Sequence, residues 1–432
     1  MQLVAYGAQD IYLTGNPQIT FFKVVYRRHT NFSIEAIQQT FEGNASSLKE
    51  GGVRTCLISR NGDLVYRMWL EGEITYKGGS NSATYLNWTN NTGHALIEEC
   101  DIEIGGQRID KHTSQWLDIW NELTDHDEKE WIGLNKHSAK NAYLKSKNSN
   151  SLNNKQLRLY IPLKFWFCRN VGLALPLIAL QYHEVKLNIK FRTIRSLLNA
   201  DIINNSLTIT ESTSVCKLFV DYIFLDTHER RRFAQVSHEY LIEQLQYKKF
   251  NSNKNLKLDF NHPVKEIIWV MSNKTRSQSA DSNNASLNAS LSIPQGGGID
   301  VFNDYFNYSN IENPTYGEYI SNQISYEGFK KATIKLNGHT RFKDRNASYF
   351  RLCQPEQAGH KIPTKHIYVY SFALNPEEHQ PSGTCNFSRL DNAHLSFDNV
   401  NDTNNKYFIN IYAVSYNVLR IMSGMGGLAY SN

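Results

Sequence analysis

The stretch CDIEIGGQRIDKH, residues 100–112, decides the fold of this chain. Apolar residues alternate with charged ones up to a Gly-Gly pair, and a polar segment follows. This alternation is typical of a strand with one buried face, and the glycines supply the positive φ values of a two-residue hairpin turn. A phosphate-binding loop would need a helix after the glycines. Because QRIDKH continues as a polar strand, we predict a β-hairpin and no nucleotide site.

A second stretch, ATIKLNGHTRFKD at 332–344, repeats this plan with an Asn-Gly turn. In both places an arginine follows closely after the turn, and an apolar strand, a proline-containing loop and another strand come further downstream. Repetition on this scale indicates one β domain used twice and not a short-period solenoid. We place the boundary between the two domains near residues 217–227.

Several other runs are apolar on both faces, as expected for strands that are covered on both sides. They are LYIPLKFWFC (159–168), CKLFVDYIFLD (216–226), HIYVYSFAL (366–374) and YFINIYAVSYNVLRIM (407–422). Many strands joined by Asn-, Gly- and Pro-rich connections predict an all-β sandwich or barrel. The best helical spacing lies in two short stretches, QWLDIWNEL (115–123) and HEYLIEQLQ (238–246), which we predict to be loop helices.

The length and charge of the chain limit the number of domains it can form and the class of protein it can belong to. Its 432 residues exceed one ordinary core, so two domains of about 200 residues are expected. The 46 basic and 41 acidic residues give a net charge of +5 that is spread along the chain. A nucleic-acid-binding protein would concentrate its basic residues, and the densest cluster, HERRRF at 228–233, is typical of a solvated face.

No targeting or membrane-spanning segment is evident. The N-terminus MQLVAYGAQD lacks the charged and apolar regions of a secretory signal. The longest apolar stretch, VGLALPLIALQY at 171–182, contains a proline and is too short to span a bilayer. We therefore expect a protein that is made and stays in a cytosolic setting.

Residues that could carry chemistry are dispersed. The cysteines form no CxxC pair, which argues against a zinc site or a disulfide framework and predicts buried free thiols. They are Cys56, Cys100, Cys168, Cys216, Cys353 and Cys385. Asp101 and Glu103 share the solvent face of a strand, which is the ordinary place for charge. The histidines form no HxH pair with a following glutamate, and no GxSxG elbow occurs, so we predict no enzyme, no metal and no cofactor.

The most distinctive stretches of the sequence lie at both ends of the chain and across the predicted boundary between the domains. They are LVAYGAQDIYLTGNPQITFFKVVYRRHTNF (3–32), ISRNGDLV (58–65), DIEIGGQRIDKH (101–112), GLALPLIALQYHEVKL (172–187), DYIFLDTHERRRFAQVSHEYLIEQLQ (221–246), QPSGTCNFSRLDNAHLSF (380–397) and YNVLRIMSGMGGLAY (416–430). Together they closely resemble the major capsid protein of large nucleocytoplasmic DNA viruses, particularly its algal-virus branch. The resemblance weakens in 125–155 and 273–330, the polar segments that we predict to be loops.

The resemblance implies an all-β fold of two tandem eight-stranded jelly-roll β-sandwiches with short loop helices. Residues 1–25 would face the capsid interior, 26–216 would form the first jelly roll and 217–432 the second. Three chains would form a homotrimeric capsomer whose six jelly rolls give a pseudo-hexagonal outline. Such capsomers would tile an icosahedral shell, so the implied function is structural.

The resemblance also implies partners and a modification. The partners would be the chain itself, neighbouring capsomers, minor capsid proteins beneath the shell and, indirectly through the interior face, an inner membrane, with no direct nucleic-acid binding. The protein would lie in the virion and, during assembly, in the host cytoplasm. Relatives carry glycans on outward loops, which makes Asn284, Asn288, Asn307 and Asn401 candidate glycosylation sites. The alternative at each site is an unmodified loop.

Two other classes of function stay open at this stage. Jelly rolls also occur in lectins and hydrolases, so a carbohydrate-binding or carbohydrate-active sandwich is the main alternative. It would require convergent carboxylates or a metal triad in a concave site. A nucleic-acid-binding protein would show strongly salt-dependent DNA affinity.

Overall fold

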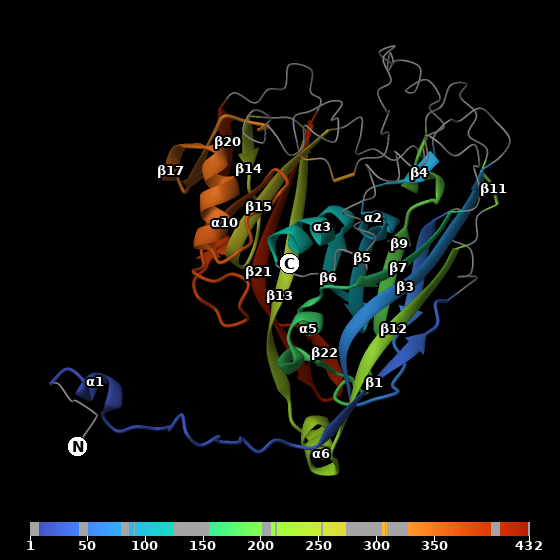
Figure 1. Ribbon diagram of the computed structural model, residues 1–432, viewed down its shortest axis with the longest axis vertical. Coiled ribbons are helices and arrows are strands. Elements are labelled where there is room, and N and C mark those ends of the chain that lie inside the picture. The colour runs from blue at the N-terminus through green and yellow to red at the C-terminus, as the bar shows by residue number, and fades with distance from the viewer. Residues whose placement is uncertain are drawn as a thin grey trace.

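Figure 1 shows the computed structural model, in which two β-sandwiches lie side by side. The structure describes residues 8–42, 51–78, 86–89, 91–124, 155–200, 209–211, 214–251, 254–273, 305–306, 308, 327–398 and 407–430. The first sandwich is coloured blue to green and the second yellow to red. Each sandwich consists of antiparallel sheets, and the double jelly-roll fold that the resemblance implied is confirmed.

Two facing antiparallel sheets form the first sandwich. One sheet has the order β1 (Phe32–Gln39), β12 (Ser214–Leu225), β3 (Leu64–Gly78) and β11 (Ile209–Glu211), and β7 (Lys155–Pro162) and β8 (Leu175–Pro176) also pair with β3. The other has the order β2 (Gly52–Leu57), β9 (Val185–Phe191), β5 (Ile97–Ile104) and β6 (Gln107–Thr113). A small separate pair joins β10 (Leu198–Ala200) to β4 (Leu86–Trp88).

The second sandwich repeats this plan. Its larger sheet has the order β13 (His238–Asn251), β21 (Tyr407–Met422), β15 (Pro263–Asn273) and β18 (Ile367–Ser371), with β19 (Cys385–Asn386) beside β15 and β22 (Met425–Leu428) beside β21. Its smaller sheet has the order β14 (Asn255–Lys257), β20 (Ala393–Asp398), β16 (Lys331–Leu336) and β17 (His339–Asn346).

Both predicted hairpin turns are confirmed. Gly105 and Gly106 have φ values of 57° and 81° and join β5 to β6. Asn337 and Gly338, with φ values of 48° and 80°, join β16 to β17 in the same way. The two echoing stretches therefore occupy matching places in the smaller sheets of the two sandwiches.

Helices are short: α1 precedes the first strand, and the others lie between strands. They are α1 (Ile11–Thr14), α2 (Thr92–Leu96), α3 (Ser114–Leu123), α5 (Trp166–Arg169), α6 (Thr227–Gln235) and α10 (Gln354–Gln357), with single turns η2 (Val171–Leu173), η3 (Arg195–Leu197), η4 (Tyr349–Cys353) and η5 (Phe387–Arg389). The predicted helix at 115–123 is confirmed as α3, whose first turn is capped by Thr113 through the Trp116 N–H. In the parts of the chain that the structure describes, no helix is long and apolar enough to cross a membrane.

The predicted helix at 238–246 is wrong, because this segment lies within strand β13. Its apolar residues Leu241, Ile242 and Leu245 also fit helical spacing. In the structure β13 pairs with β21 without a break from His238–Ile421 to Asn251–Phe408. A long hydrogen-bonded ladder in a buried sheet outweighs the weak local preference of a nine-residue stretch.

The larger sheet of the second sandwich is buried on both faces. On one face, Ile267 and Trp269 of β15 pack with the smaller sheet of the same sandwich. On the other face, Ile268 and Val270 join the core of the first sandwich. Burial on both faces explains why 407–422 has no apolar–polar alternation.

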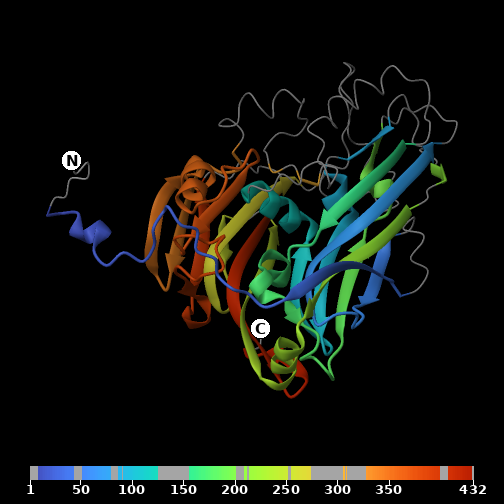
Figure 2. The ribbon, with the colours of Figure 1, turned by 60° about the horizontal axis from the view of Figure 1, so that its bottom comes forward.

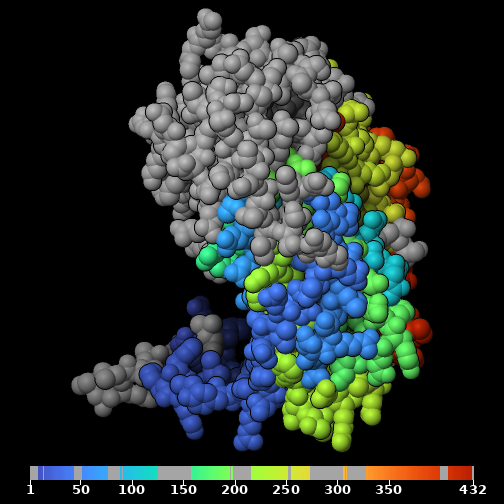
Figure 3. Space-filling view, turned by 90° about the vertical axis from the view of Figure 1, so that its right-hand side faces the viewer, coloured from blue at the N-terminus to red at the C-terminus, as the bar shows by residue number. Residues whose placement is uncertain are grey.

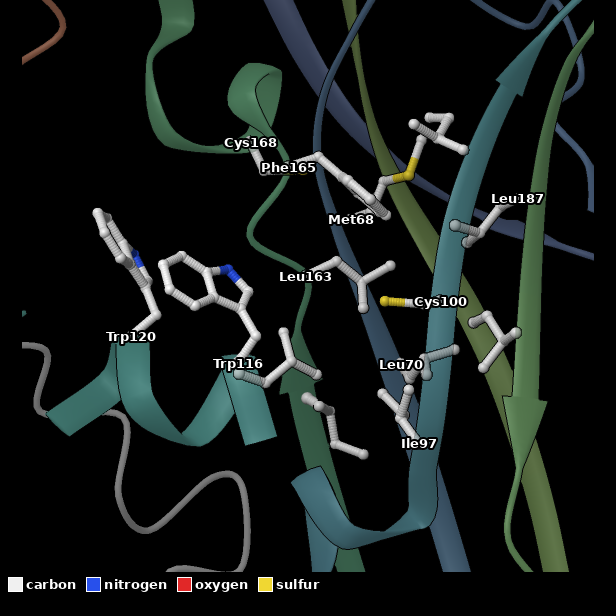
Figure 4. Close-up of a cluster of buried hydrophobic side chains, with 14 of the residues drawn as sticks. Met68, Leu70, Ile97, Cys100, Trp116, Trp120, Leu163, Phe165, Cys168 and Leu187 are labelled. Carbon is white, nitrogen blue, oxygen red and sulfur yellow. The ribbon is translucent and has the colours of Figure 1, made fainter. Parts of the chain in front are cut away.

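The core of the first sandwich is built from both of its sheets (Figure 4). Met68 and Leu70 of β3 meet Cys100 of β5 and Leu187 of β9 across the sandwich. Trp116 of α3 lies at the edge of this group. The same continuous cluster of buried side chains reaches β13, β15 and β21, so the two sandwiches share part of one core.

Strand β12 crosses the predicted boundary between residues 216 and 217. It pairs with β3 from Ser214 to Ile223, and with β1 from Leu218 to Leu225. The whole strand thus belongs to a sheet of the first sandwich.

Candidate assembly surfaces

Helix α3 of the first sandwich packs on the outer face of the larger sheet of the second, and we call this contact the seam. The rings of Trp116 and Tyr412 lie 5.5 Å apart. Gln115 accepts hydrogen bonds from Asn410 at 2.7 Å and from the Tyr412 hydroxyl at 3.2 Å. The seam therefore combines aromatic packing with fixed polar contacts.

The middle and the end of α3 meet the loop that follows α10. Asp118, which is fully buried, accepts hydrogen bonds from Lys365 at 2.5 Å and from the Tyr308 hydroxyl at 2.9 Å. Thr364 donates to Glu122 at 2.9 Å. Since each pair joins segments about 190 to 250 residues apart in the chain, these contacts hold the second sandwich to the first.

A buried ion cluster extends the seam to β13 and β15. Lys265 Nζ lies 2.7 Å from Glu243, and Arg169 of α5 lies 2.9 Å from the same carboxylate. Arg169 also covers the ring of Trp120 at 4.8 Å. Burial by itself raises the pKa of Glu243, but the two cations outweigh burial and lower it. The Glu243 carboxylate is thus ionised and paired.

His360 forms a second buried charged group beside the first. Its two ring nitrogens lie 2.8 Å from Glu266 and 2.6 Å from Glu377. Burial lowers the pKa of His360, but the two carboxylates outweigh burial and raise it to about 9. The imidazolium therefore links β15 to the loop that carries Glu377.

The seam explains how one chain can present two sandwiches as one rigid block. Apolar contacts supply most of its stability. Buried charges are costly unless each partner is in place, so they favour one arrangement over others. The seam fixes the angle between the sandwiches, and with it the outline of the molecule.

The second surface is an extended arm formed by residues 8–31. Figures 2 and 3 show that it leaves the body as a single segment. Its apolar side chains are in solvent: Phe21 is 92% exposed, Phe22 98% and Tyr26 85%. Apolar side chains gathered in this way on the surface of a folded chain mark an interaction site.

The structure describes little that resembles a catalytic centre. Among the residues it describes, no three His, Cys, Asp or Glu side chains gather as a metal ion would require. A shallow hollow of about 270 Å³ beside η4 is lined by one carboxylate, Asp344, together with Arg345, Tyr349 and Cys353. Asp101 and Glu103 share one half-exposed face of β5, as predicted.

All six cysteines are free thiols, and four of them are buried as predicted. Burial raises the pKa of Cys56, Cys168 and Cys216 to about 12, so these thiols are unreactive at neutral pH. Cys353 is exposed and Cys385 half-buried, which differs from the prediction of buried thiols. Cys353 is the last residue of η4, and Cys385 of β19 packs against the edge of the second sandwich core.

The four candidate glycosylation sites, Asn284, Asn288, Asn307 and Asn401, lie outside the described residues.

The contacts of the seam were not predicted from the sequence. Only the apolar spacing of 115–123 gave a signal, because the partners of α3 lie far away in the chain. The sequence of the arm contributes to the family resemblance, and its cluster of aromatic residues already departs from an ordinary polar terminus.

Two fused β-sandwiches held by a buried seam, with an apolar arm, define a structural protein made for association. Two family models match the chain. "Major capsid protein N-terminus" covers residues 20–226, and "Large eukaryotic DNA virus major capsid protein" covers residues 229–427. The chain belongs to this family of viral major capsid proteins, as the resemblance predicted. It is a structural virion component and not an enzyme.

Individual relatives agree with the family models. The chain is 48% identical to the major capsid protein of Pyramimonas orientalis virus and 42% identical to that of Paramecium bursaria Chlorella virus 1, in each case over 100% of this chain and 99% of the relative. Among solved structures, the chain in a quasi-atomic model of the PBCV-1 virus capsid is 37% identical, with a TM-score of 0.74 over 96% of this chain and 100% of that one. The Faustovirus major capsid protein, 13% identical, shares the fold with a TM-score of 0.69 over 96% of this chain and 94% of that one.

Proposed function

We propose that three copies of this chain form a pseudo-hexagonal capsomer, and that such capsomers tile the icosahedral shell of a large DNA virus. The observation that carries this proposal is the seam, which fixes two similar sandwiches side by side in one chain. Around a threefold axis, two such blocks per chain give six similar outlines. Six similar outlines suit close packing in a shell.

The likeness to the PBCV-1 capsid chain supports the same proposal, because similarity extends over 96% of this chain. A permanent trimer should bury about 2,000 Å² or more at each contact. The exposed first five residues of β1 are available for such contacts. Neighbouring capsomers are the second expected partner.

We propose that the arm faces the capsid interior, where minor capsid proteins lie and beyond which the inner membrane is found. The predicted interior segment, 1–25, covers most of the arm, which runs on to the start of β1 at Phe32. We also propose that the first jelly roll ends after Leu225 and not at residue 216, because β12 pairs within the first sandwich. Assembly would take place in the host cytoplasm.

We propose glycans at Asn284, Asn288, Asn307 and Asn401 on loops that face outward. Sequence is the only support for this assignment, since each position lies in an Asn/Ser-rich segment. Intact-protein mass spectrometry of virion material tests it, followed by peptide mapping. Peptides that carry these residues at unmodified mass would refute it.

The capsomer itself is tested by light scattering on the purified full-length protein. A trimer has a mass of about 149 kDa, three times the 49.7 kDa of one chain. Negative-stain images of the same peak should show hexagonal outlines. A folded species that stays near 49.7 kDa when concentrated, with no partner added, would contradict an autonomous capsomer.

A further inference from the structure

The arm has a chemistry that the capsomer does not explain. From Ile11 to Ile34 the sequence contains Lys23, Arg27 and Arg28 but no aspartate or glutamate. The large apolar side chains between and beside these cations are exposed. They are Ile19, Phe21, Phe22, Val24, Val25 and Tyr26. Aromatic and aliphatic side chains next to unopposed cations are typical of segments that bind the surface of an anionic bilayer.

The apolar side chains of the arm do not form one face. In an extended chain, alternate residues point to opposite sides. Val24 and Tyr26 would point one way and Val25 the other, while Phe21 and Phe22 lie in a turn just before them. A groove on a folded partner covers one face well, whereas the headgroup region of a bilayer can receive both.

The end of the body from which the arm leaves continues the apolar surface. Phe32 pairs with Leu225, so the arm and α6 leave the same end of the sheet. We call this end of the body the base. Four exposed apolar side chains lie on it: Tyr182, Val236, Met422 and Met425. The Tyr182 N–H donates to Gly424 at 2.9 Å, and His238 pairs with Ile421, which brings these residues together. Figure 3 shows α6 and the root of the arm at this same end.

The positive charge at this end comes mainly from the arm. On α6, Arg231 and Arg232 are exposed, while Arg230 pairs with Asp63 at 2.9 Å. Asp226 and Glu229 offset part of the charge of that helix. The arm has no carboxylate after Asp10, so an anionic surface would be attracted first to Lys23, Arg27 and Arg28.

We propose that the arm and the base bind directly to the surface of an anionic lipid bilayer. The phenylalanines and Tyr26 enter the boundary between headgroups and acyl chains, and Lys23, Arg27 and Arg28 extend to the phosphates. The base then lies against the headgroups through Met422 and Met425. This inference deepens the proposed function and depends on it only for the side of the shell on which the bilayer lies.

The test is co-sedimentation of the full-length protein with phosphatidylcholine vesicles that contain or lack phosphatidylserine. Binding should require phosphatidylserine and weaken from about 0.1 M to about 1 M salt, as the screening length falls. The triple variant Lys23→Gln, Arg27→Gln, Arg28→Gln should bind about a hundredfold more weakly. The variant Phe21→Ser, Phe22→Ser should lose at least about tenfold.

A matched control changes three exposed cations of β17, which lies away from the base in Figure 1: Arg341→Gln, Lys343→Gln and Arg345→Gln. This control should bind vesicles like the parent protein. The inference is overturned if the parent does not sediment with anionic vesicles, or if the arm variants bind as well as the control. It is also overturned if the arm variants change the mass by light scattering, because a second copy then covers the arm.

Light scattering on the same samples separates this inference from the proposed function. A trimer that does not sediment with anionic vesicles refutes the bilayer contact and leaves the proposed capsomer standing. A persistent monomer refutes the autonomous capsomer, whatever the vesicles show.

Discussion

At the scale of single residues, the two turn glycines of the opening hairpin have different surroundings. A Cβ on Gly105 would lie 2.3 Å from His183 Nδ1, whereas a Cβ on Gly106 would meet nothing within 4 Å. Gly105→Ala must displace the His183 imidazole, whose Nδ1 is hydrogen-bonded to the backbone of Gly426. We expect Gly105→Ala to lower the free energy of unfolding by about 3 kcal/mol and Gly106→Ala by about 1 kcal/mol, the strain of positive φ alone. Urea unfolding of both variants measures the difference, and equal losses would contradict it.

Lys265 allows a second prediction at this scale, because its side chain is fully buried and paired with Glu243. Lys265→Met leaves the Glu243 carboxylate buried with Arg169 as its remaining close cation, so we expect a loss of about 3 kcal/mol. The matched control is Lys257→Met, which breaks an exposed pair with Asp259 and should cost about 0.5 kcal/mol. Thermal unfolding of both variants checks this. A loss at Lys265 no larger than at Lys257 would show that the buried pair contributes little.

At the scale of elements, His360 makes the link between β15 and the loop of Glu377 depend on pH. Its pKa rises from 6.5 to about 9 on folding. The stabilisation of about 3 kcal/mol is therefore complete below pH 6.5 and is lost as the pH rises through about 9. Unfolding free energies measured between these two pH values should fall in the parent protein and fall much less in His360→Gln.

His94 supplies the control for this pH dependence. Burial lowers its pKa to about 3, so it stays neutral throughout the same range. A His94→Gln variant should differ from the parent in stability by a constant amount only, so the slope of its unfolding free energy against pH should match that of the parent. A slope that vanishes in His94→Gln as well would assign the effect to another group.

The elements also show which parts of the structure the sequence could predict. The hairpins at 105–106 and 337–338 follow from local chemistry, since glycine or asparagine must supply positive φ. Helix α3 follows from its apolar spacing. The strand at 238–251 was misread because its partner, β21, lies more than 150 residues away. The pairing of His360 with Glu266 could not be predicted for the same reason, because only the folded chain brings β15 and that loop together.

At the scale of the whole molecule, a shared core should make the two sandwiches unfold together. The cluster around Met68 and Leu70 continues into Ile268, Tyr412 and Val414 of the second sandwich. We therefore expect calorimetry at a fixed protein concentration to show one transition, with calorimetric and van't Hoff enthalpies close to each other. Two separate transitions in the parent protein would contradict a seam that couples the sandwiches.

A variant that disrupts the seam tests the same coupling between the sandwiches by removing it. Trp116→Ala with Tyr412→Ala removes an aromatic pair whose rings lie 5.5 Å apart across the seam. Each truncation should cost about 3 to 5 kcal/mol, and the single transition should split because the coupling is lost. Trp269→Ala, on the other face of the same sheet, damages only the second sandwich core and serves as the control. If the seam sets the outline of the capsomer, the double variant should also lose regular hexagonal outlines in negative stain while Trp269→Ala molecules that remain folded keep them.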